Sequence, residues 1–353
     1  MKLSLASLFL ITSIPLMAFA DEPVKKLSLS SESLTLTLTP NIGGRVLSVA
    51  RNGQNNILKV GDAVQQQPAP HVHAGADNIA YLGHEIWVGP QSAWWVHQSV
   101  NPARAAKKAV WPPDPWLGQG TDTVIKHSAQ RIELESQPSP VSGLQLRKRW
   151  QLIEGLPDSI LLEAEAVNTR DEPVAWDLWF NTRLHPQARA YVPVANKEQA
   201  RFQHITDEQH APLDYQWHGS FLTLNLTTPE APAQARRGKV FIQPDAGWMA
   251  GFYGEQVLII HFPLQPEARI HPEQGQIELY LEYFPGDASA GLLEMEVHAP
   301  YEKLAPGQRM SATEIWTLLP YLGQATAAEE TAFLREQIPL LEQRLNKAGV
   351  AIK

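Results

Sequence analysis

The stretch LTLTLTPNIGGRVLSVARNG, residues 34–53, decides the fold class of this chain. Leucine alternates with threonine over residues 34–38, the period of two that is typical of a strand with one buried face. The segment PNIGG at 40–44 interrupts this strand, and a strand-like run resumes over 45–49. Asn52-Gly53 then marks a tight hairpin turn. The stretch therefore predicts antiparallel strands joined by tight turns.

Similar runs recur along most of the 353 residues. With 44% hydrophobic and only 19% charged residues, the chain can build a sizeable core, which excludes general disorder. Turn-forming residues separate most of the runs, as in an antiparallel sandwich or barrel. We therefore expect an all-β fold. The further strand-like runs lie at 124–127, 132–135, 144–152, 160–167, 175–181, 221–226, 240–243, 248–252, 257–262, 277–284, 292–297 and 310–318.

Two segments depart from the strand pattern. Residues 63–119 are rich in Pro, His, Trp and Gly, and we expect long ordered loops there, which in a compact domain usually serve function. Residues 327–347 predict an amphipathic C-terminal helix that packs on the outside of the sheets. Since no repeat or low-complexity linker is present, we expect residues 21–353 to form a single domain. The apolar side chains of the helix are Phe333, Leu334, Ile338, Leu341 and Leu345.

The first twenty residues, MKLSLASLFLITSIPLMAFA, have the features of a secretory signal peptide. Lys2 supplies the positive charge, residues 3–17 are mostly apolar, and Ala18-Phe19-Ala20 is a small-x-small cleavage site. The alternative is a membrane anchor, but the apolar run is short for a span of about 20 residues. We therefore expect cleavage, no membrane anchor afterwards, and a periplasmic location, with secretion as the alternative.

Charge and cysteine content exclude several classes of function. The 37 acidic and 29 basic residues give a formal charge of −8, which argues against binding nucleic acid. Without cysteine, the chain has no disulfide, thiolate metal site or thiol nucleophile. His71, His73 and His84 match no recognised zinc or iron spacing, and no phosphate-binding loop or dinucleotide motif is present. We expect neither a metal nor a cofactor; the alternative is a metal site, since His71 and His73 would share a strand face with His84 nearby.

The densest group of chemically useful side chains is YLGHEIWVGPQSAWW at 81–95, followed by WPPDPW at 111–116. Flat indole faces beside imidazole, carboxylate and amide groups suit a sugar, because the C–H face of a pyranose stacks on indole and its hydroxyls bond to the polar groups. The alternative is that the tryptophans fill the core and the prolines shape loops. This group contributes four candidates, His84, Trp87, Gln91 and Trp95.

A second group is WDLWFNTRLH at 176–185. In a strand, one face would carry Asp177, Trp179, Asn181 and Arg183, and the other would be mainly apolar. Such a strand could line a cleft with an acid, an amide and a guanidinium side by side. The alternative is an exposed face that carries an Asp–Arg pair.

A third group is LLEMEVHAP at 292–300. Glu294, Glu296 and His298 would share one face of a strand, and Glu282 could lie beside them. A carboxylate among other carboxylates in a cleft acquires a raised pKa and can act as a general base near neutral pH. The alternative is a solvated strand face.

These motifs together resemble an uncharacterised bacterial domain family that belongs with the galactose-mutarotase-like proteins. The resemblance covers residues 28–319 and rests on Gly43-Gly44-Arg45, on GHEIWVGPQ at 83–91, on WPPDP at 111–115, and on LEMEV at 293–297 followed by LAPG at 304–307. It implies an antiparallel β-supersandwich whose concave face binds carbohydrate. In aldose 1-epimerases of this superfamily a glutamate acts as general base, and Glu294 matches it. Asp177 stands where those enzymes have the acid histidine.

Together with the expected export, the resemblance implies an exported protein that binds a sugar or oligosaccharide. An aldose 1-epimerase-like isomerase is one form that this function could take. In that case Glu294 would be the base, and Asp177 or His84 the acid. Arg45 and Arg183 would hold hydroxyls or a uronate, and Trp87 and Trp95 would stack on the ring. The rival hypotheses are a non-catalytic periplasmic glycan-binding protein and an envelope protein that docks an unknown partner. The remaining substrate-binding candidates are Gln91, Trp179, Asn181, Glu282 and Glu296.

Overall fold

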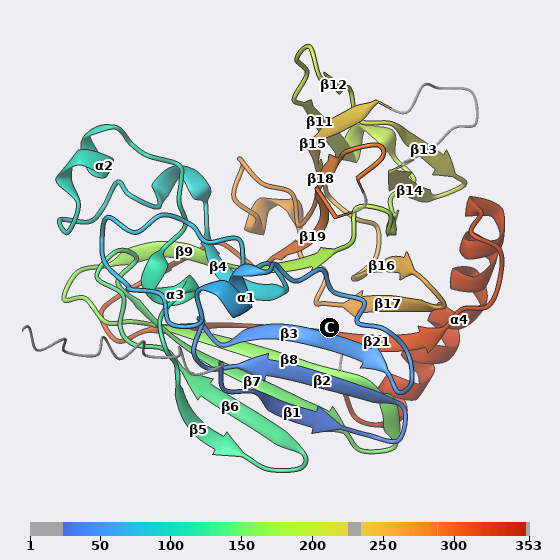
Figure 1. The fold of residues 1–353 in the computed structure, drawn as a ribbon, viewed down its shortest axis with the longest axis horizontal. Helices are drawn as coiled ribbons and strands as arrows, with labels where there is room; N and C mark the ends of the chain where they lie inside the picture. Colours follow the sequence, from blue (N-terminus) through green and yellow to red (C-terminus); the bar gives the residue numbers. More distant parts are fainter. Residues whose placement is uncertain (1–23, 225–233, 288, 351–353) are drawn as a thin grey trace, which may run out of the picture.

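The computed structural model describes residues 24–224, 234–287 and 289–350. The signal segment expected at 1–20 lies outside these residues, as does the end of the strand expected at 221–226. Two large sheets dominate the structure, which confirms the predicted all-β class (Figure 1). Within the described residues, the pairings between named strands are antiparallel apart from that of β12 with β15.

The first sheet has eleven strands. In spatial order its main path is β1 (Leu27–Ser30), β2 (Leu34–Thr39), β3 (Arg45–Arg51), β4 (His84–Gly89), β9 (Val174–Leu184), β19 (Leu292–His298), β18 (Ile277–Tyr283), β15 (Ala235–Ile242) and β11 (Ala200–His204). Two short strands lie off this path, β12 (His210–Ala211) beside β15 and β20 (Glu302–Leu304) beside β9.

The second sheet has ten strands. Its spatial order is β13 (Tyr215–His218), β14 (Phe221–Leu224), β10 (Arg189–Pro193), β16 (Trp248–Tyr253), β17 (Gln256–His261), β21 (Arg309–Pro320), β8 (Leu156–Asn168), β7 (Leu144–Ile153), β6 (Arg131–Glu135) and β5 (Thr123–His127).

The stretch that opened the sequence analysis forms β2 and β3, which pair in antiparallel register. Leucines of β2 are fully buried and its threonines are half-buried up to Thr37, as the alternation predicts. The glycine pair between the strands has a steric cause. Gly44 has φ +58°, and a Cβ there would lie 2.4 Å from the carboxylate of Asp122, so a side chain would displace this buried group.

The long loops expected at 63–119 are interrupted by a central strand, which corrects that prediction. β4 lies between β3 and β9, and all six of its residues are buried. Because both faces are covered, the sequence HEIWVG lacks the alternation that marks a half-buried strand. Short helices occur elsewhere in this stretch: α1 (Ala63–Gln66), η1 (Gln91–Ala93), α2 (Pro102–Ala106) and α3 (Pro115–Gly118). Two further short helices are η2 (Lys197–Gln199) and η3 (Glu267–Arg269).

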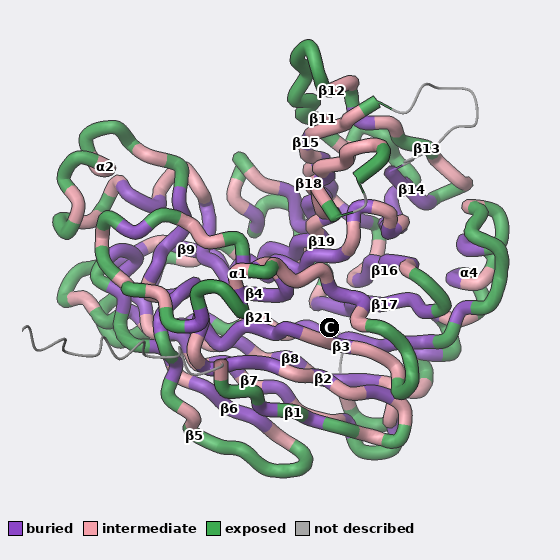
Figure 2. The backbone as a smooth tube through the Cα atoms, viewed as in Figure 1, coloured by how far each residue is buried: buried purple, intermediate pink, exposed green. Residues whose placement is uncertain are grey.

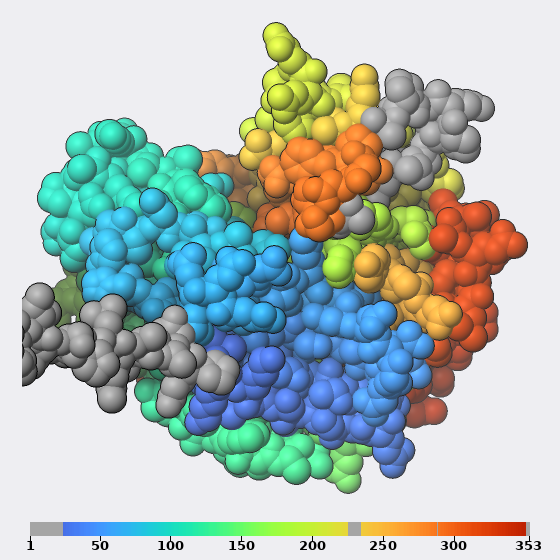
Figure 3. Space-filling view, viewed as in Figure 1, coloured from blue at the N-terminus to red at the C-terminus, as the bar shows by residue number. Residues whose placement is uncertain are grey.

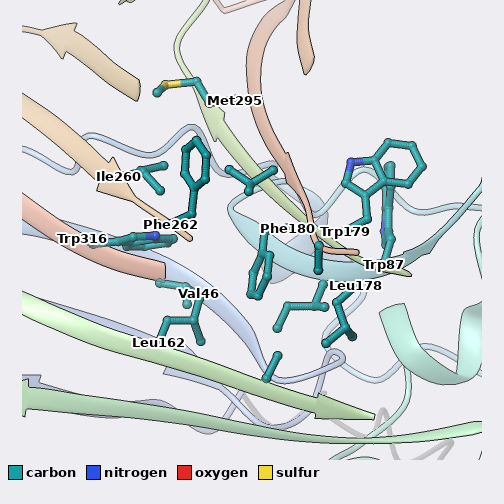
Figure 4. Packing of buried hydrophobic residues seen from close by; sticks show 14 of the residues in the cluster. Val46, Trp87, Leu162, Leu178, Trp179, Phe180, Ile260, Phe262, Met295 and Trp316 are labelled. Carbon is teal, nitrogen blue, oxygen red and sulfur yellow. The ribbon is translucent and has the colours of Figure 1, made fainter. Parts of the chain in front are cut away.

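The main core lies between the two sheets. Leu178 and Phe180 of β9 point into it, toward Leu162 of β8, whereas Trp179 points to the opposite side of its sheet (Figure 4). Full burial of such side chains stabilises the fold by about 1.5–3 kcal/mol each. The backbone is accordingly buried through the centre of the molecule and exposed in the outer loops (Figure 2).

Helix α4 (Ala327–Lys347) confirms the predicted C-terminal helix and packs on the outer face of the second sheet. Leu334, Ile338, Leu341 and Leu345 are buried there, against residues that include Val257 of β17. Among the helices of the described ranges, none combines the length and apolar character that a membrane crossing requires.

Candidate active site

The outer face of the first sheet carries a cleft with a volume of about 610 Å³. One side consists of the segment before β4 and the loops after it, the other of the lobe around β11 and β15, and the surface is hollowed between them (Figure 3). Strands β9, β18 and β19 contribute residues between these two sides. The lining residues are Asn78, Ala80, Leu82, Trp87, Gln91, Trp111, Trp179, Arg183, Gln203, Ile205, Arg237, Lys239, Tyr280, Glu282, Leu292, Glu294 and Glu296.

Strand register explains why residues far apart in the sequence meet at this cleft. Trp87 of β4 lies directly opposite Trp179 of β9. On the other side of β9, Arg183 pairs with Glu294. Directly opposite residues project to the same face of a sheet, so these side chains come together. The odd-numbered side chains of β9 therefore face the cleft side, as the alternation in the sequence indicated.

Tryptophans form an aromatic wall of the cleft. The rings of Trp87 and Trp179 are 5.0 Å apart and perpendicular. Trp94 stacks behind Trp179 at 5.8 Å, and Trp111 lies 6.2 Å from Trp87 with 49% of its surface exposed. Trp95, expected to stack on a sugar, is instead fully buried, and its indole N–H donates to the carbonyl oxygen of Pro112. It supports the loop and does not line the cleft.

Arg183 is the central cation of the cleft. Its Nε donates to Glu294 Oε1 at 2.7 Å and its Nη1 to Glu85 Oε1 at 2.8 Å. Its guanidinium carbon also lies 4.9 Å from the Trp87 ring centroid. These contacts fix the orientation of Arg183, because two different nitrogens of its guanidinium group each donate to a carboxylate.

Arg45 does not reach the cleft, although the sequence analysis placed it among the substrate-binding residues. Its Nη2 donates to Glu85 Oε2 at 2.6 Å and to the carbonyl oxygen of Gly118 at 2.9 Å. Burial raises the pKa of Glu85, but Arg45 and Arg183 outweigh it and lower that pKa to about 2. Arg45 therefore positions Arg183 through the ionised Glu85.

A buried chain of ion pairs runs beneath the tryptophans. Lys239 Nζ lies 2.8 Å from Glu296 Oε2 and 2.5 Å from Glu278 Oε2. His298 Nε2 lies 3.4 Å from Glu278 Oε1, and His298 Nδ1 lies 3.2 Å from Asp177 Oδ2. The alternation of acid and base links Glu296, at the bottom of the cleft, to Asp177 deeper in the sheet.

The pKa values of these buried ion-pair residues are shifted in different directions. Burial, and the carboxylates of Glu294 and Glu278, raise the pKa of Glu296 well above its ordinary value, against the effect of Lys239. Burial acts the same way on Glu278, but Lys239 and His298 outweigh it and lower its pKa to about 2. Burial lowers the pKa of His298, whereas Glu278 and Asp177 raise it to a net value of about 9. At neutral pH His298 is therefore a cation.

Neither of the two acids proposed from the sequence reaches the cleft. His84 lies on the core face of β4, where Nδ1 is 3.0 Å from Thr182 Oγ1 and the ring meets the Trp316 ring at 4.7 Å. Burial is the largest cause that lowers its pKa to about 3, so it stays neutral. Asp177 is fully buried below the cleft and accepts hydrogen bonds from the Gly89 backbone N–H and from His298.

The remaining predicted residues are placed as follows. Gln91 lines the cleft, and its amide donates to the carbonyl oxygen of Val110 at 2.8 Å. Glu282 also lines it, paired with Arg237 Nε at 3.0 Å. Asn181 is fully buried and donates to Glu296 Oε1 at 3.4 Å, so it supports a lining residue rather than the cleft itself.

The lining residues that sequence reasoning missed as candidates include Trp111, Arg237, Lys239 and Tyr280. Arg237 and Lys239 alternate along β15, and this pattern in ARRGKVFI is a signal that could have marked a charged strand face. What the sequence could not indicate is that β15 pairs with β18, which brings these cations to the carboxylates.

Three buried groups lie close enough to suggest a metal site. Ligand atoms of Glu278, Glu296 and His298 lie within 4.8 Å of one another. The ammonium group of Lys239 already bonds two of the three, and it supplies the positive charge that an ion would bring. The arrangement therefore fits a lysine-centred ion-pair network and would hold a metal only if Lys239 were displaced.

Comparisons with known proteins agree with this fold. A putative aldose 1-epimerase from Escherichia coli K12 superimposes with a TM-score of 0.50 at 16% identity, covering 84% of this chain and 99% of that one. The Slr1438 protein from Synechocystis sp. PCC 6803 gives a TM-score of 0.51 at 16% identity, covering 84% and 96%. A galactose mutarotase-like protein from Lactobacillus casei ATCC 334 gives 0.50 at 10%, covering 84% and 100%.

These superpositions show a shared fold and confirm the galactose-mutarotase-like architecture predicted from the sequence. No curated protein matches the chain in sequence. A family model, described as a domain of unknown function, DUF4380, matches residues 24–319. The chain therefore belongs to the DUF4380 family.

Proposed function

We propose that this protein binds a carbohydrate in the cleft on the outer face of the first sheet. The observation that carries the proposal is the aromatic wall of Trp87, Trp111 and Trp179 beside the paired charges of Arg183 and Glu294. An indole face suits the C–H face of a pyranose, and fixed charged groups suit its hydroxyls. The cleft volume of about 610 Å³ lies within the range of about 300–1,000 Å³ that is usual for small-molecule sites.

A second function, aldose 1-epimerase-like isomerisation, is favoured by the position of Glu294. Its carboxylate lines the cleft, keeps 13% of its surface exposed and is oriented by Arg183. A carboxylate held in this way can take the proton of an anomeric hydroxyl, the first step of ring opening. A putative aldose 1-epimerase has the same fold, and this likeness of fold supports the reaction class.

Proton NMR on a panel of monosaccharides, uronic acids and oligosaccharides tests both functions, with wild type beside Glu294→Gln. Line broadening of sugar signals reports binding, and exchange between anomers above the spontaneous rate reports isomerisation. We expect both signals in the wild type, and we expect exchange to disappear in Glu294→Gln while broadening persists. Broadening without exchange would leave a glycan-binding protein. A wild type that broadens no sugar signal, oligosaccharides included, would contradict carbohydrate binding.

Export belongs to the same proposal. The charged, apolar and small-x-small segments within residues 1–20 motivate it. The test is mass spectrometry of the protein recovered from a Gram-negative periplasmic fraction. If residues 1–20 are removed during export, the measured mass should match a chain that begins at Asp21. An uncleaved chain in the cytosolic fraction would contradict export.

A further inference from the structure

Ring opening needs a proton donor as well as a base, and the cleft must supply it. The acids suggested by sequence, Asp177 and His84, both lie away from the cleft. We propose that Glu296 is the general acid of this site and gives its proton to the ring oxygen of the sugar. This inference rests on the isomerase activity proposed above.

The first argument is a charge count along the ion pairs. One set alternates as Arg45, Glu85, Arg183 and Glu294, with two cations and two carboxyl groups. The second set alternates as Asp177, His298, Glu278, Lys239 and Glu296, with three carboxyl groups and two cations. The second set has one carboxyl group in excess. An unpaired buried charge is costly, so this set retains one proton.

The second argument locates that proton. Glu278 touches both cations, Lys239 and His298, and stays ionised. Asp177 accepts the Gly89 backbone N–H at 2.8 Å, and its other oxygen lies 3.2 Å from His298 Nδ1, so each oxygen of this carboxyl group faces a donor. Burial raises the pKa of Glu296, and the carboxylates of Glu294 and Glu278 raise it further, because the single cation of Glu296, Lys239, is shared with Glu278.

The third argument is geometry. Glu294 and Glu296 project from the same face of β19, and both line the cleft. Trp179 Nε1 donates to Glu296 Oε2 at 3.2 Å, and Asn181 Nδ2 lies 3.4 Å from Oε1, so the carboxyl group is held in place. Two adjacent carboxyl groups, one of which has a raised pKa, can act as an acid and base pair.

The proton transfers balance. Glu294 takes the proton from the anomeric hydroxyl, whose oxygen forms the aldehyde double bond. The bond between the anomeric carbon and the ring oxygen breaks, and the ring oxygen takes both that electron pair and the proton of Glu296. After rotation about the neighbouring carbon–carbon bond, the reverse steps close the ring and return each proton to its starting group.

Two neighbouring groups are weaker donors. The ring of His298 is fully buried under Trp179, and its nitrogens face Asp177 and Glu278 rather than the cleft. Tyr280 lines the cleft, but its hydroxyl accepts from Arg237, and burial is the main cause that raises its pKa to about 12. A phenol with so high a pKa is a poor proton donor near neutral pH.

The test compares anomer exchange in wild type, Glu296→Gln and Glu296→Asp over pH. Titratable groups that face Glu296 are Lys239 from β15, Glu278 from β18 and Glu294 from its own strand. We expect the wild-type rate to fall as pH rises through the pKa of Glu296. Glu296→Gln should lose about 100-fold or more and lose this dependence, as general acid catalysis contributes about 10²–10⁴-fold. Glu296→Asp should recover part of the rate. Equal rates in wild type and Glu296→Gln would overturn the proposal, as would an aspartate variant no better than the glutamine variant.

An infrared measurement separates this inference from the isomerase proposal. The difference spectrum of wild type minus Glu296→Gln at neutral pH, without any sugar, should contain the carbonyl stretch of a protonated carboxyl group. A difference spectrum with only carboxylate bands would overturn the assignment. If no sugar exchanges anomers faster with the wild type, the isomerase function fails, and the carbonyl band alone then shows whether Glu296 holds the proton.

Discussion

Two buried glutamates in this molecule have similar surroundings and different positions. Glu296 accepts the indole N–H of Trp179 at 3.2 Å, and Glu314 of β21 accepts that of Trp316 at 2.8 Å. Burial raises the pKa of both, to about 8 in the case of Glu314. Glu296 lines the cleft, whereas Glu314 shares a strand face with Trp316, which packs in the core between the sheets.

Glu296 and Glu314 differ in whether a molecule bound in the cleft could take the proton of the carboxyl group. Glu296 lines the cleft beside Glu294, so a sugar bound there could take its proton directly. Among the described residues, Glu314 pairs with no cation, and its Oε1 has no hydrogen-bond partner. Burial alone therefore raises a pKa, but only the position beside a cleft and a second carboxylate gives that shift a chemical use.

The largest effect is expected for Lys239→Met, which removes the cation beside Glu296 and leaves the surroundings of Glu314 unchanged. Glu278 and Glu296 would then be buried without their shared cation. Loss of one partner from a buried ion pair costs about 3–5 kcal/mol. We expect the free energy of unfolding, measured with urea at pH 7, to fall by that amount.

Lys126→Met is the matched control, since Lys126 is exposed on the edge strand β5. Its effect should stay within about 0.5 kcal/mol, as for other surface substitutions. If Lys239→Met changed stability no more than Lys126→Met does, the Lys239 ion pairs would contribute nothing and the charge count at Glu296 would lose its basis.

The next effect on the free energy of unfolding is expected for Glu314→Gln, and this effect should depend on pH. The folded pKa of about 8 exceeds the ordinary value of 4.5, so between about pH 5 and pH 8 the folded state holds a proton that the unfolded state has lost. Wild-type stability therefore falls in this window by about 1.4 kcal/mol per pH unit relative to Glu314→Gln. Unfolding in urea at several pH values measures the difference.

Substitution of Glu314 and of Glu296 should differ in their effect on anomer exchange. Glu314→Gln should leave anomer exchange at the wild-type rate, because its side chain lies in the core and away from the cleft. A stability difference between wild type and Glu314→Gln that stays constant from pH 5 to pH 8 would show that Glu314 is not a buried neutral carboxyl group.

The contrast between the two faces of β9 shows how far the sequence could predict this site. Alternation in WDLWFNTRL assigned Trp179, Asn181 and Arg183 to one face, and all three lie on the cleft side. The same rule would have excluded His84, which lies one residue out of phase with Glu85 and Trp87 on β4. It could not be applied, because β4 is buried on both faces and was not recognised as a strand.

Strand pairing is the part that the sequence could not reveal. Glu296 is opposite Glu278 in β18, and β18 pairs in turn with β15, which carries Lys239. These three strands are separated by loops of different length, and no local pattern specifies which strands become neighbours. The residues of each strand face were therefore predictable, whereas the cation that Glu296 shares with Glu278 was visible only in the fold.

The smallest effect is expected at the rim of the cleft, for Trp111→Ala. With 49% of its surface exposed, Trp111 contributes little to the core, and the melting temperature should stay near that of the wild type. Loss of one stacking face costs about 1 kcal/mol, so sugar affinity measured by NMR titration should fall about fivefold. Tyr301→Ala is the matched control, an exposed aromatic residue that does not line the cleft in the described structure. Equal affinities for wild type and Trp111→Ala would place the sugar on Trp87 and Trp179 alone, deeper in the cleft and closer to Glu296, whereas a selective loss in Trp111→Ala would extend the binding surface to the rim.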